Sequence, residues 1–114
     1  MRKLLLLLLS TLIYSLSAHA QGTLEPLLGF LHDQSGITFQ VFSGGCTSKQ
    51  SFTIENELEN KRNLVSLIRT KPDYCKAFFF FGTYVYFNYD ELGINRGQSF
   101  EIQNPVVGSS RPKF

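Results

Sequence analysis

Two cysteines and one histidine are the residues after position 20 whose types are suited to redox, metal or nucleophilic chemistry. Cys46 and Cys75 lie 29 positions apart, without a CxxC motif. An even number of cysteines in an exported chain is typical of a structural disulfide, and we predict a Cys46–Cys75 bridge. A reactive dithiol or metal pair is the alternative. Because His32 and scattered carboxylates form no ligand cluster, we expect no metal site and no cofactor.

Nucleophilic catalysis requires a base oriented against a serine, threonine or cysteine. A set of Ser43, His32 and Asp90 is conceivable, but nothing in the spacing singles these residues out. Asp90 and Glu91 are adjacent, so their side chains lie on different faces and do not form a glycosidase pair. We therefore predict that the chain is not an enzyme, and we keep a small hydrolase using His32 as an alternative.

An aromatic segment, KAFFFFGTYVYFNY, runs from Lys76 to Tyr89. Gly82 divides it, which indicates a bulge or a tight bend. A continuous apolar run is typical of a strand that is buried on both faces. Four exposed phenylalanines on a neutral chain would also drive association. We therefore predict that Phe78–Phe81 are mostly buried.

The second half of this segment alternates in a way that predicts a strand with two different faces. Val85 and Phe87 share the inner face, while Tyr84 and Tyr86 share the opposite face, which we expect to be at least half exposed. Tyr84 and Tyr86, together with Tyr89, are the best candidates for a binding surface. Exposed aromatic side chains of this kind bind partner proteins or stack on sugars. Binding to a protein partner is the leading prediction, and a carbohydrate-binding module is an alternative.

A basic cluster surrounds the turn that leads into Cys75. Arg69, Lys71 and Lys76 could together bind an acidic partner, and we include them among the candidate binding residues. Such a cluster is more often the solvated end of a strand pair, and Asp73 neutralises part of its charge.

The first twenty residues have the pattern of a secretory signal peptide. Arg2 and Lys3 precede the apolar run 4–9, and Ala18 and Ala20 supply small residues before a cleavage site. A run of six apolar residues is far shorter than the ~20 that span a bilayer. We predict cleavage after Ala20, a periplasmic or secreted product, and no transmembrane anchor in that product.

Cleavage would leave 94 of the 114 residues, enough for one domain with one modest core. Without Arg2 and Lys3, nine of the eleven basic residues remain against nine acidic ones. This neutral balance argues against a nucleic acid or an anionic membrane surface as partner. We assign residues 21–107 to a single exported β-domain and residues 108–114 to a flexible C-terminal tail.

Several short segments alternate between apolar and polar residues, which is typical of half-buried strands. These segments are residues 37–42, 51–55, 64–68, 83–89 and 99–103. We expect their inward side chains to share one core: Phe39, Val41, Phe52, Ile54, Val85, Phe87, Phe100 and Ile102. Residues 21–36 combine apolar residues with glycine, proline and turn-forming residues and show no clear alternation. Residues 56–63 are predicted to be a solvated connection, and a single helical turn that pairs Glu57 with Lys61 is an option. Residues 90–93 predict a helical turn that ends at Gly93.

The number and spacing of these segments predict an all-β domain, with turn chemistry between the strands. We expect a small antiparallel β-sandwich or barrel of five to six strands and one disulfide, with an immunoglobulin-like arrangement among the candidates.

Overall fold

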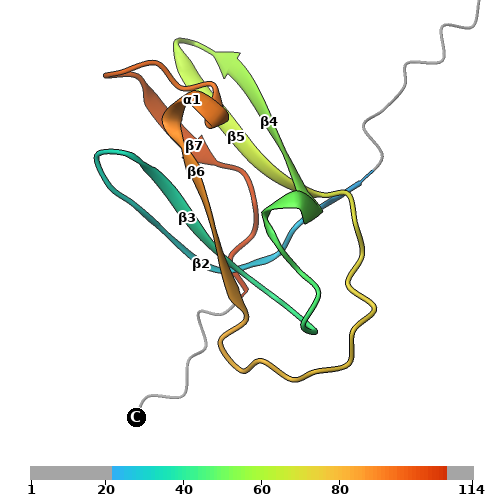
Figure 1. Cartoon of the computed structure of the whole chain (residues 1–114). Helices are drawn as coiled ribbons and strands as arrows, with labels where there is room; N and C mark the ends of the chain where they lie inside the picture. Colours follow the sequence, from blue (N-terminus) through green and yellow to red (C-terminus); the bar gives the residue numbers. More distant parts are fainter. Residues whose placement is uncertain (1–21, 108–114) are drawn as a thin grey trace, which may run out of the picture.

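A computed structural model describes residues 22–107 as a β-sandwich of two sheets (Figure 1). Its elements are β1 (Thr23–Leu24), β2 (Leu27–His32), β3 (Gly36–Val41), a 3₁₀ helix (Lys49–Ser51), β4 (Phe52–Glu59), β5 (Arg62–Arg69), β6 (Thr83–Asn88), α1 (Tyr89–Leu92) and β7 (Ser99–Ile102). The predicted signal peptide, residues 1–20, and the predicted tail, residues 108–114, lie outside the described residues.

The two sheets confirm the predicted all-β class. One sheet has the order β1-β5-β4, with β7 also paired to β5, and the other has the order β2-β3-β6. Most neighbouring strands are antiparallel, but β5 and β7 run parallel. The expectation of a purely antiparallel sandwich was therefore wrong at this pair. Residues 89–98 carry the chain from one sheet to the other, so β7 enters beside β5 in the same direction.

Two strands lie in residues 21–36, where the sequence showed no clear alternation. Within residues 22–107 this gives seven strands, more than the predicted five to six. β1 pairs with β5 in one sheet and β2 pairs with β3 in the other, and Pro26 lies at the crossing between the sheets. The alternation was hidden because β1 has only two residues and β2 contains a register shift between Leu27 and Gly29.

The charged stretch of residues 56–63 forms the closed end of a β-hairpin, so the predicted solvated connection and its optional helical turn are both wrong. β4 extends to Glu59 and β5 begins at Arg62, with Asn60 and Lys61 between them. Both residues have positive φ angles, 50° and 65°, as a two-residue turn of the I′ type requires. The sequence did not reveal this turn because neither residue is glycine.

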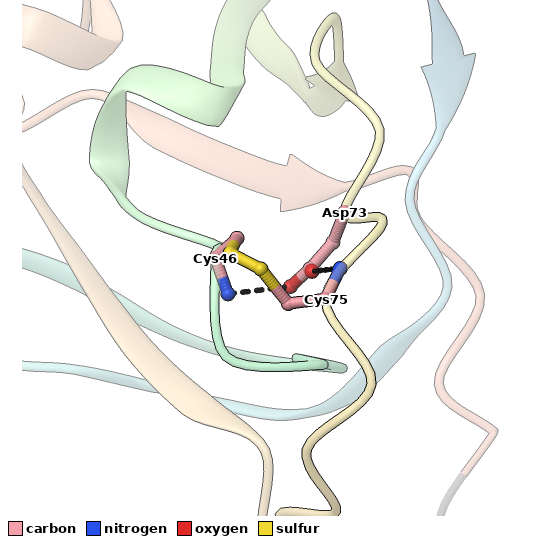
Figure 2. A group of neighbouring side chains, drawn as sticks. All are labelled: Cys46, Asp73 and Cys75. Atoms are coloured by element: carbon pink, nitrogen blue, oxygen red, sulfur yellow. Dashed lines mark hydrogen bonds between the residues drawn. A yellow bond between two sulfur atoms is a disulfide. The ribbon is translucent and has the colours of Figure 1, made fainter.

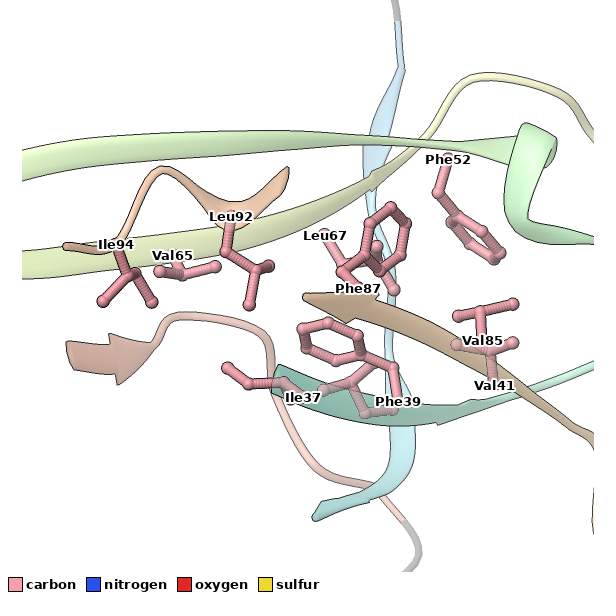
Figure 3. Close-up of a cluster of buried hydrophobic side chains, with 11 residues drawn as sticks. Ile37, Phe39, Val41, Phe52, Val65, Leu67, Val85, Phe87, Leu92 and Ile94 are labelled. Carbon is pink, nitrogen blue, oxygen red and sulfur yellow. The ribbon is translucent and has the colours of Figure 1, made fainter. Parts of the chain in front are cut away.

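The core lies between the two sheets, as Figure 3 shows for side chains of β3, β5 and β6. Of the eight predicted inward residues, five are buried, namely Phe39, Val41, Phe52, Val85 and Phe87. Ile54, Phe100 and Ile102 are half-buried and pack against them. The predicted strand faces are therefore confirmed, and the core already contains three phenylalanine rings.

Candidate functional site

A long segment without regular secondary structure, residues 70–82, connects β5 to β6, and we call it the aromatic loop (Figure 1). Phe78, Phe79, Phe80 and Phe81 are 86%, 51%, 63% and 66% exposed, and Tyr74 is 83% exposed. The prediction that the four phenylalanines are mostly buried was wrong. Their run has the composition of a buried strand, but it lies outside both sheets.

Gly82 explains why the strand begins only after the phenylalanines. Its φ angle is +65°, and a Cβ atom there would lie 1.9 Å from the carbonyl oxygen of Val41. The amide of Gly82 donates to the carbonyl of Phe79 at 3.0 Å, which closes a tight turn. The chain therefore reaches the end of β3 through a sharp bend, and β6 starts at Thr83.

The exposed rings contact one another and are linked to the sandwich through the backbone. Phe80 packs edge-on against Phe81 with ring centroids 5.0 Å apart, and Phe78 lies 6.4 Å from Phe80. The side-chain amide of Gln40 donates to the carbonyl of Phe81 at 2.8 Å. The aromatic loop is thus an ordered surface of phenylalanine rings at one end of the sandwich.

A disulfide between Cys46 and Cys75 fastens this loop to the segment that follows β3 (Figure 2). The predicted bridge is confirmed, with 5.7 Å between the two Cα atoms. Next to it, the amide of Ala77 donates to the carbonyl of Gly44 at 2.8 Å. Because the cysteines are joined, they offer no thiolate for metal binding, although the Asp73 carboxylate lies beside them.

The Asp73 carboxylate gathers donors from both sides of this disulfide. One oxygen accepts hydrogen bonds from the amides of Gly44 and Cys46, at 2.8 and 3.1 Å, and from the hydroxyl of Thr47 at 2.7 Å. The other oxygen accepts from the amide of Cys75 at 3.0 Å. These hydrogen bonds, led by that of the Thr47 hydroxyl, hold the pKa of Asp73 well below its ordinary value of 3.8. Asp73 is therefore a structural anion that organises the base of the loop.

A groove of about 430 Å³ lies beside the exposed rings. Its lining comes from three regions of the chain: Glu25, Phe42, Ser43, Gly44, Arg69, Pro72, Asp73, Phe78 and Phe79. Glu25 and Arg69 form a largely buried ion pair, with 2.6 Å between Oε2 and Nε. Burial raises the pKa of Glu25, and the hydrogen bond from Arg69 acts against that rise. The groove thus combines an ion pair with aromatic walls.

The basic cluster divides into one internal residue and two external ones. Besides Glu25, the Arg69 guanidinium donates to the hydroxyl of Thr47 and to the carbonyls of Phe42 and Lys71, and it lies over the Phe52 ring. Its donors are therefore used inside the protein. Lys71 and Lys76 are exposed on the aromatic loop, where they can meet a partner.

The three candidate tyrosines lie in different environments. Tyr84 is 62% exposed and Tyr86 is 38% exposed, so they lie on the outer face of β6 as predicted, although Tyr86 is less than half exposed. The Tyr86 hydroxyl donates to Ser35 Oγ at 2.6 Å. Tyr89 is half-buried and its hydroxyl donates to the carbonyl of Asp33 at 2.6 Å. Only Tyr84 therefore presents most of its surface to solvent.

The structure does not bring Ser43, His32 and Asp90 together as a catalytic set. β3 and β6 pair from Gly36 opposite Asn88 to Val41 opposite Thr83, so Ser43 lies at the opposite end of this sheet from Asp90. His32 lies near the Asp90 end, and its ring contacts Phe100 at a centroid distance of 5.5 Å. The structure thus separates the serine from the other two residues.

Sequence reasoning missed three contributors to this surface. It placed Phe78–Phe81 in the core, and it gave no role to Phe42 or Tyr74, which are 49% and 83% exposed. The available signal was the Lys71-Pro72-Asp73 turn, which ends two positions before Cys75 and marks residues 70–75 as a loop.

Comparisons with family models, with curated proteins and with solved structures give no match to this chain, so the immunoglobulin-like arrangement stays a prediction. Within residues 22–107, no helix has the length and apolar character needed to cross a membrane.

Proposed function

We propose that this chain is an exported, disulfide-bonded, non-catalytic domain that binds a protein partner through the aromatic loop. The observation that carries the proposal is the exposure of Phe78–Phe81 on a loop that the Cys46–Cys75 disulfide and Asp73 hold in place. Exposed apolar patches of this kind on a small protein mark interaction surfaces.

The bracing of the loop favours binding, since a surface that is already ordered loses little conformational entropy when a partner docks. The disulfide, the Asp73 hydrogen bonds and the contact between Ala77 and Gly44 all order the loop without a partner. Aromatic side chains in such a setting are the residues that dominate binding energy in protein interfaces.

The groove favours a protein partner over a flat lipid surface. Phe42, Pro72, Phe78 and Phe79 form walls around a volume of about 430 Å³, which is enough space to receive an apolar side chain. Lys71 and Lys76 lie exposed on the same loop, whereas the Asp73 carboxylate is occupied by internal donors. The partner surface that fits is an apolar protrusion with acidic residues around it.

The test compares a Phe78→Ser/Phe79→Ser double variant with the unmodified protein as bait in an envelope extract. Leu31→Ser is the matched control, because Leu31 is 76% exposed and lies on β2, away from the loop. We expect the double variant to lose the captured protein while its melting temperature stays unchanged, and the control to retain capture. Capture of the same proteins by all three forms would refute the proposal.

Three further measurements separate the alternatives. Binding to neutral or anionic lipid vesicles that depends on the same two phenylalanines would replace the protein partner with a bilayer. Binding on a glycan array that is lost in Tyr84→Ser would favour the carbohydrate-binding module. A hydrolytic activity that disappears in His32→Ala would favour the small hydrolase.

Export to the periplasm or the medium is part of the proposal. It is supported by the signal-like pattern of residues 1–20 and by the disulfide, which persists in oxidising compartments. Intact-mass measurement of the exported protein should give a chain that begins at Gln21. A mass that retains the apolar run 4–9 would contradict both the cleavage and the assignment of compartment.

A further inference from the structure

β6 is an edge strand with an open outer side. Among residues 22–107 it pairs with β3 and with no other strand. In an antiparallel ladder, directly opposite residues alternate between hydrogen-bonded and non-hydrogen-bonded pairs. The amide of Tyr89 donates to the carbonyl of Ser35, so the position of Tyr89 is a hydrogen-bonded one. Val85 lies four residues before Tyr89 and therefore also forms a hydrogen-bonded pair, with Phe39 of β3. The backbone groups of Tyr84 and Tyr86 therefore point away from β3.

The other side of β3 agrees with this assignment. The amide of Asp33 donates to the carbonyl of Gly36, so the even-numbered residues of β3 bond to β2 and the odd-numbered ones bond to β6. One N–H and one C=O from each of Tyr84 and Tyr86 are thus free of β3. Together they form an unpaired ladder of two donors and two acceptors, which flanks Val85.

The side chains of β6 do not protect this edge. Thr83–Asn88 contain no charged residue, no proline and no bulge. Natural edge strands are usually protected by one of these features. β4, an edge strand of the other sheet, carries Glu55, Glu57 and Glu59, which would repel a second copy of the same strand. β2, the other edge strand of the sheet that contains β6, is interrupted by a register shift between Leu27 and Gly29. β6 is therefore an edge that is suited to self-pairing.

We propose that a second copy of this chain pairs with β6 across a two-fold axis at Val85, giving a continuous six-stranded sheet. An isologous contact needs each residue to meet a partner that meets it in return. In antiparallel pairing about Val85, Tyr84 lies opposite Tyr86 of the second copy, and Tyr86 lies opposite its Tyr84. Both are hydrogen-bonded pairs, so all four free N–H groups in the dimer find carbonyl acceptors.

The exposed tyrosines add side-chain contacts to this pairing. Tyr84 and Tyr86 lie on the same outer face of β6, and they would meet as cross-strand aromatic pairs. On the inner side, Lys49 lies over the Phe87 ring and pairs with Glu91, toward the α1 end of the strand. The backbone N–H and C=O groups of Tyr84 and Tyr86 favour a second copy as the partner, because two copies of β6 can form hydrogen bonds to each other's free groups. This inference does not rest on the proposed function of the aromatic loop.

The test is the oligomeric state, measured by analytical ultracentrifugation of the full exported chain over a wide range of concentration. Tyr84→Pro removes an N–H that β3 does not use, and Tyr84→Lys places like charges close together in the dimer. We expect a reversible dimer, with the dissociation constant raised about tenfold or more in either variant. Leu31→Lys changes an apolar residue on β2 that is even more exposed than Tyr84, and it should leave the dissociation constant unchanged.

Hydrogen exchange gives a second readout that does not depend on any variant. The amides of Tyr84 and Tyr86 should exchange more slowly as the protein concentration rises, whereas the amide of Leu31 should not change. A monomer at all concentrations would overturn the proposal, and so would a dimer that survives both Tyr84 variants. A dimer that is lost only in Phe78→Ser/Phe79→Ser would assign the contact to the aromatic loop and overturn it as well. A complex in which a strand of a different protein protects these amides would also count against the second copy.

Discussion

The carboxylate of Asp73 accepts a hydrogen bond from the backbone amide of Cys46, 27 positions earlier in the chain, over a distance of 3.1 Å. Its second oxygen accepts from the amide of Cys75. One carboxylate thus holds the backbones of both cysteines of the disulfide (Figure 2). The base of the aromatic loop is fixed by a covalent link and by an ionised group together.

Replacing Asp73 with asparagine should destabilise the protein at neutral pH and much less in acid. The pKa of Asp73 is lowered in the folded state, so its stabilisation is present above the ordinary value of 3.8 and is lost as the pH falls below it. The difference in melting temperature between the two proteins should therefore be constant from pH 7 to about 5, and it should shrink in more acidic solution.

Asp90→Asn is the control for this measurement, because Asp90 is an exposed carboxylate outside the loop. Its melting temperature should follow that of the unmodified protein at every pH. An equal difference between Asp73→Asn and the unmodified protein at pH 7 and pH 2 would show that the charge of Asp73 does not stabilise the loop.

Removal of the disulfide should lower stability and release the aromatic loop. Cys75→Ser is expected to reduce the free energy of unfolding by about 2–5 kcal/mol, measured by urea denaturation. Chymotrypsin cleaves after phenylalanine, so cleavage within Phe78–Phe81 should become faster in the variant than in the oxidised protein. Alkylation of cysteine in the oxidised protein before reduction would contradict the bridge.

Asn104 should be one of the most sensitive polar positions in the fold. Its buried amide group accepts from the amide of Leu67 at 2.9 Å and donates to the carbonyls of Glu25 and Leu67 at 2.8 Å. It therefore satisfies the backbone N–H and C=O of Leu67 on β5, at the gap between the segments of β5 that pair with β1 and with β7. Asn104→Ala should cost about 1–3 kcal/mol for each buried group left without a partner. Chemical denaturation measures this cost, and Gln103→Ala, an exposed neighbour, should be nearly neutral.

Lys61→Gly should stabilise the β4–β5 hairpin. Lys61 has a φ angle of 65° in a two-residue turn, a conformation that costs a side-chain-bearing residue about 1–2 kcal/mol and glycine almost nothing. Part of this gain is offset by the greater freedom of glycine in the unfolded chain. Thermal unfolding should show a higher melting temperature. A lower one would indicate that the turn differs from the structure or that the Lys61 side chain contributes elsewhere.

Local sequence patterns were sufficient to predict most of the strands and their faces. The alternation of residues 37–42 and 83–89 assigned Phe39, Val85 and Phe87 to the core, and the structure buries all three. The disulfide, the bend at Gly82 and the helical turn ending at Gly93 were also predictable. Each of these features follows from residue types within a few positions or from the count of cysteines, which is information that a single sequence carries.

The position of Phe78–Phe81 was decided only in three dimensions. Their composition suits a buried strand, but burial depends on whether the space between the sheets is already filled, and Phe39, Phe52 and Phe87 fill it. The bend that places the four rings outside depends on Gly82 meeting the carbonyl of Val41, far back in the chain. The gathering of donors around Asp73 and the open edge of β6 likewise depend on which distant segments become neighbours. Such contacts are set by the packing of the whole domain, so residue patterns within a single segment do not predict them.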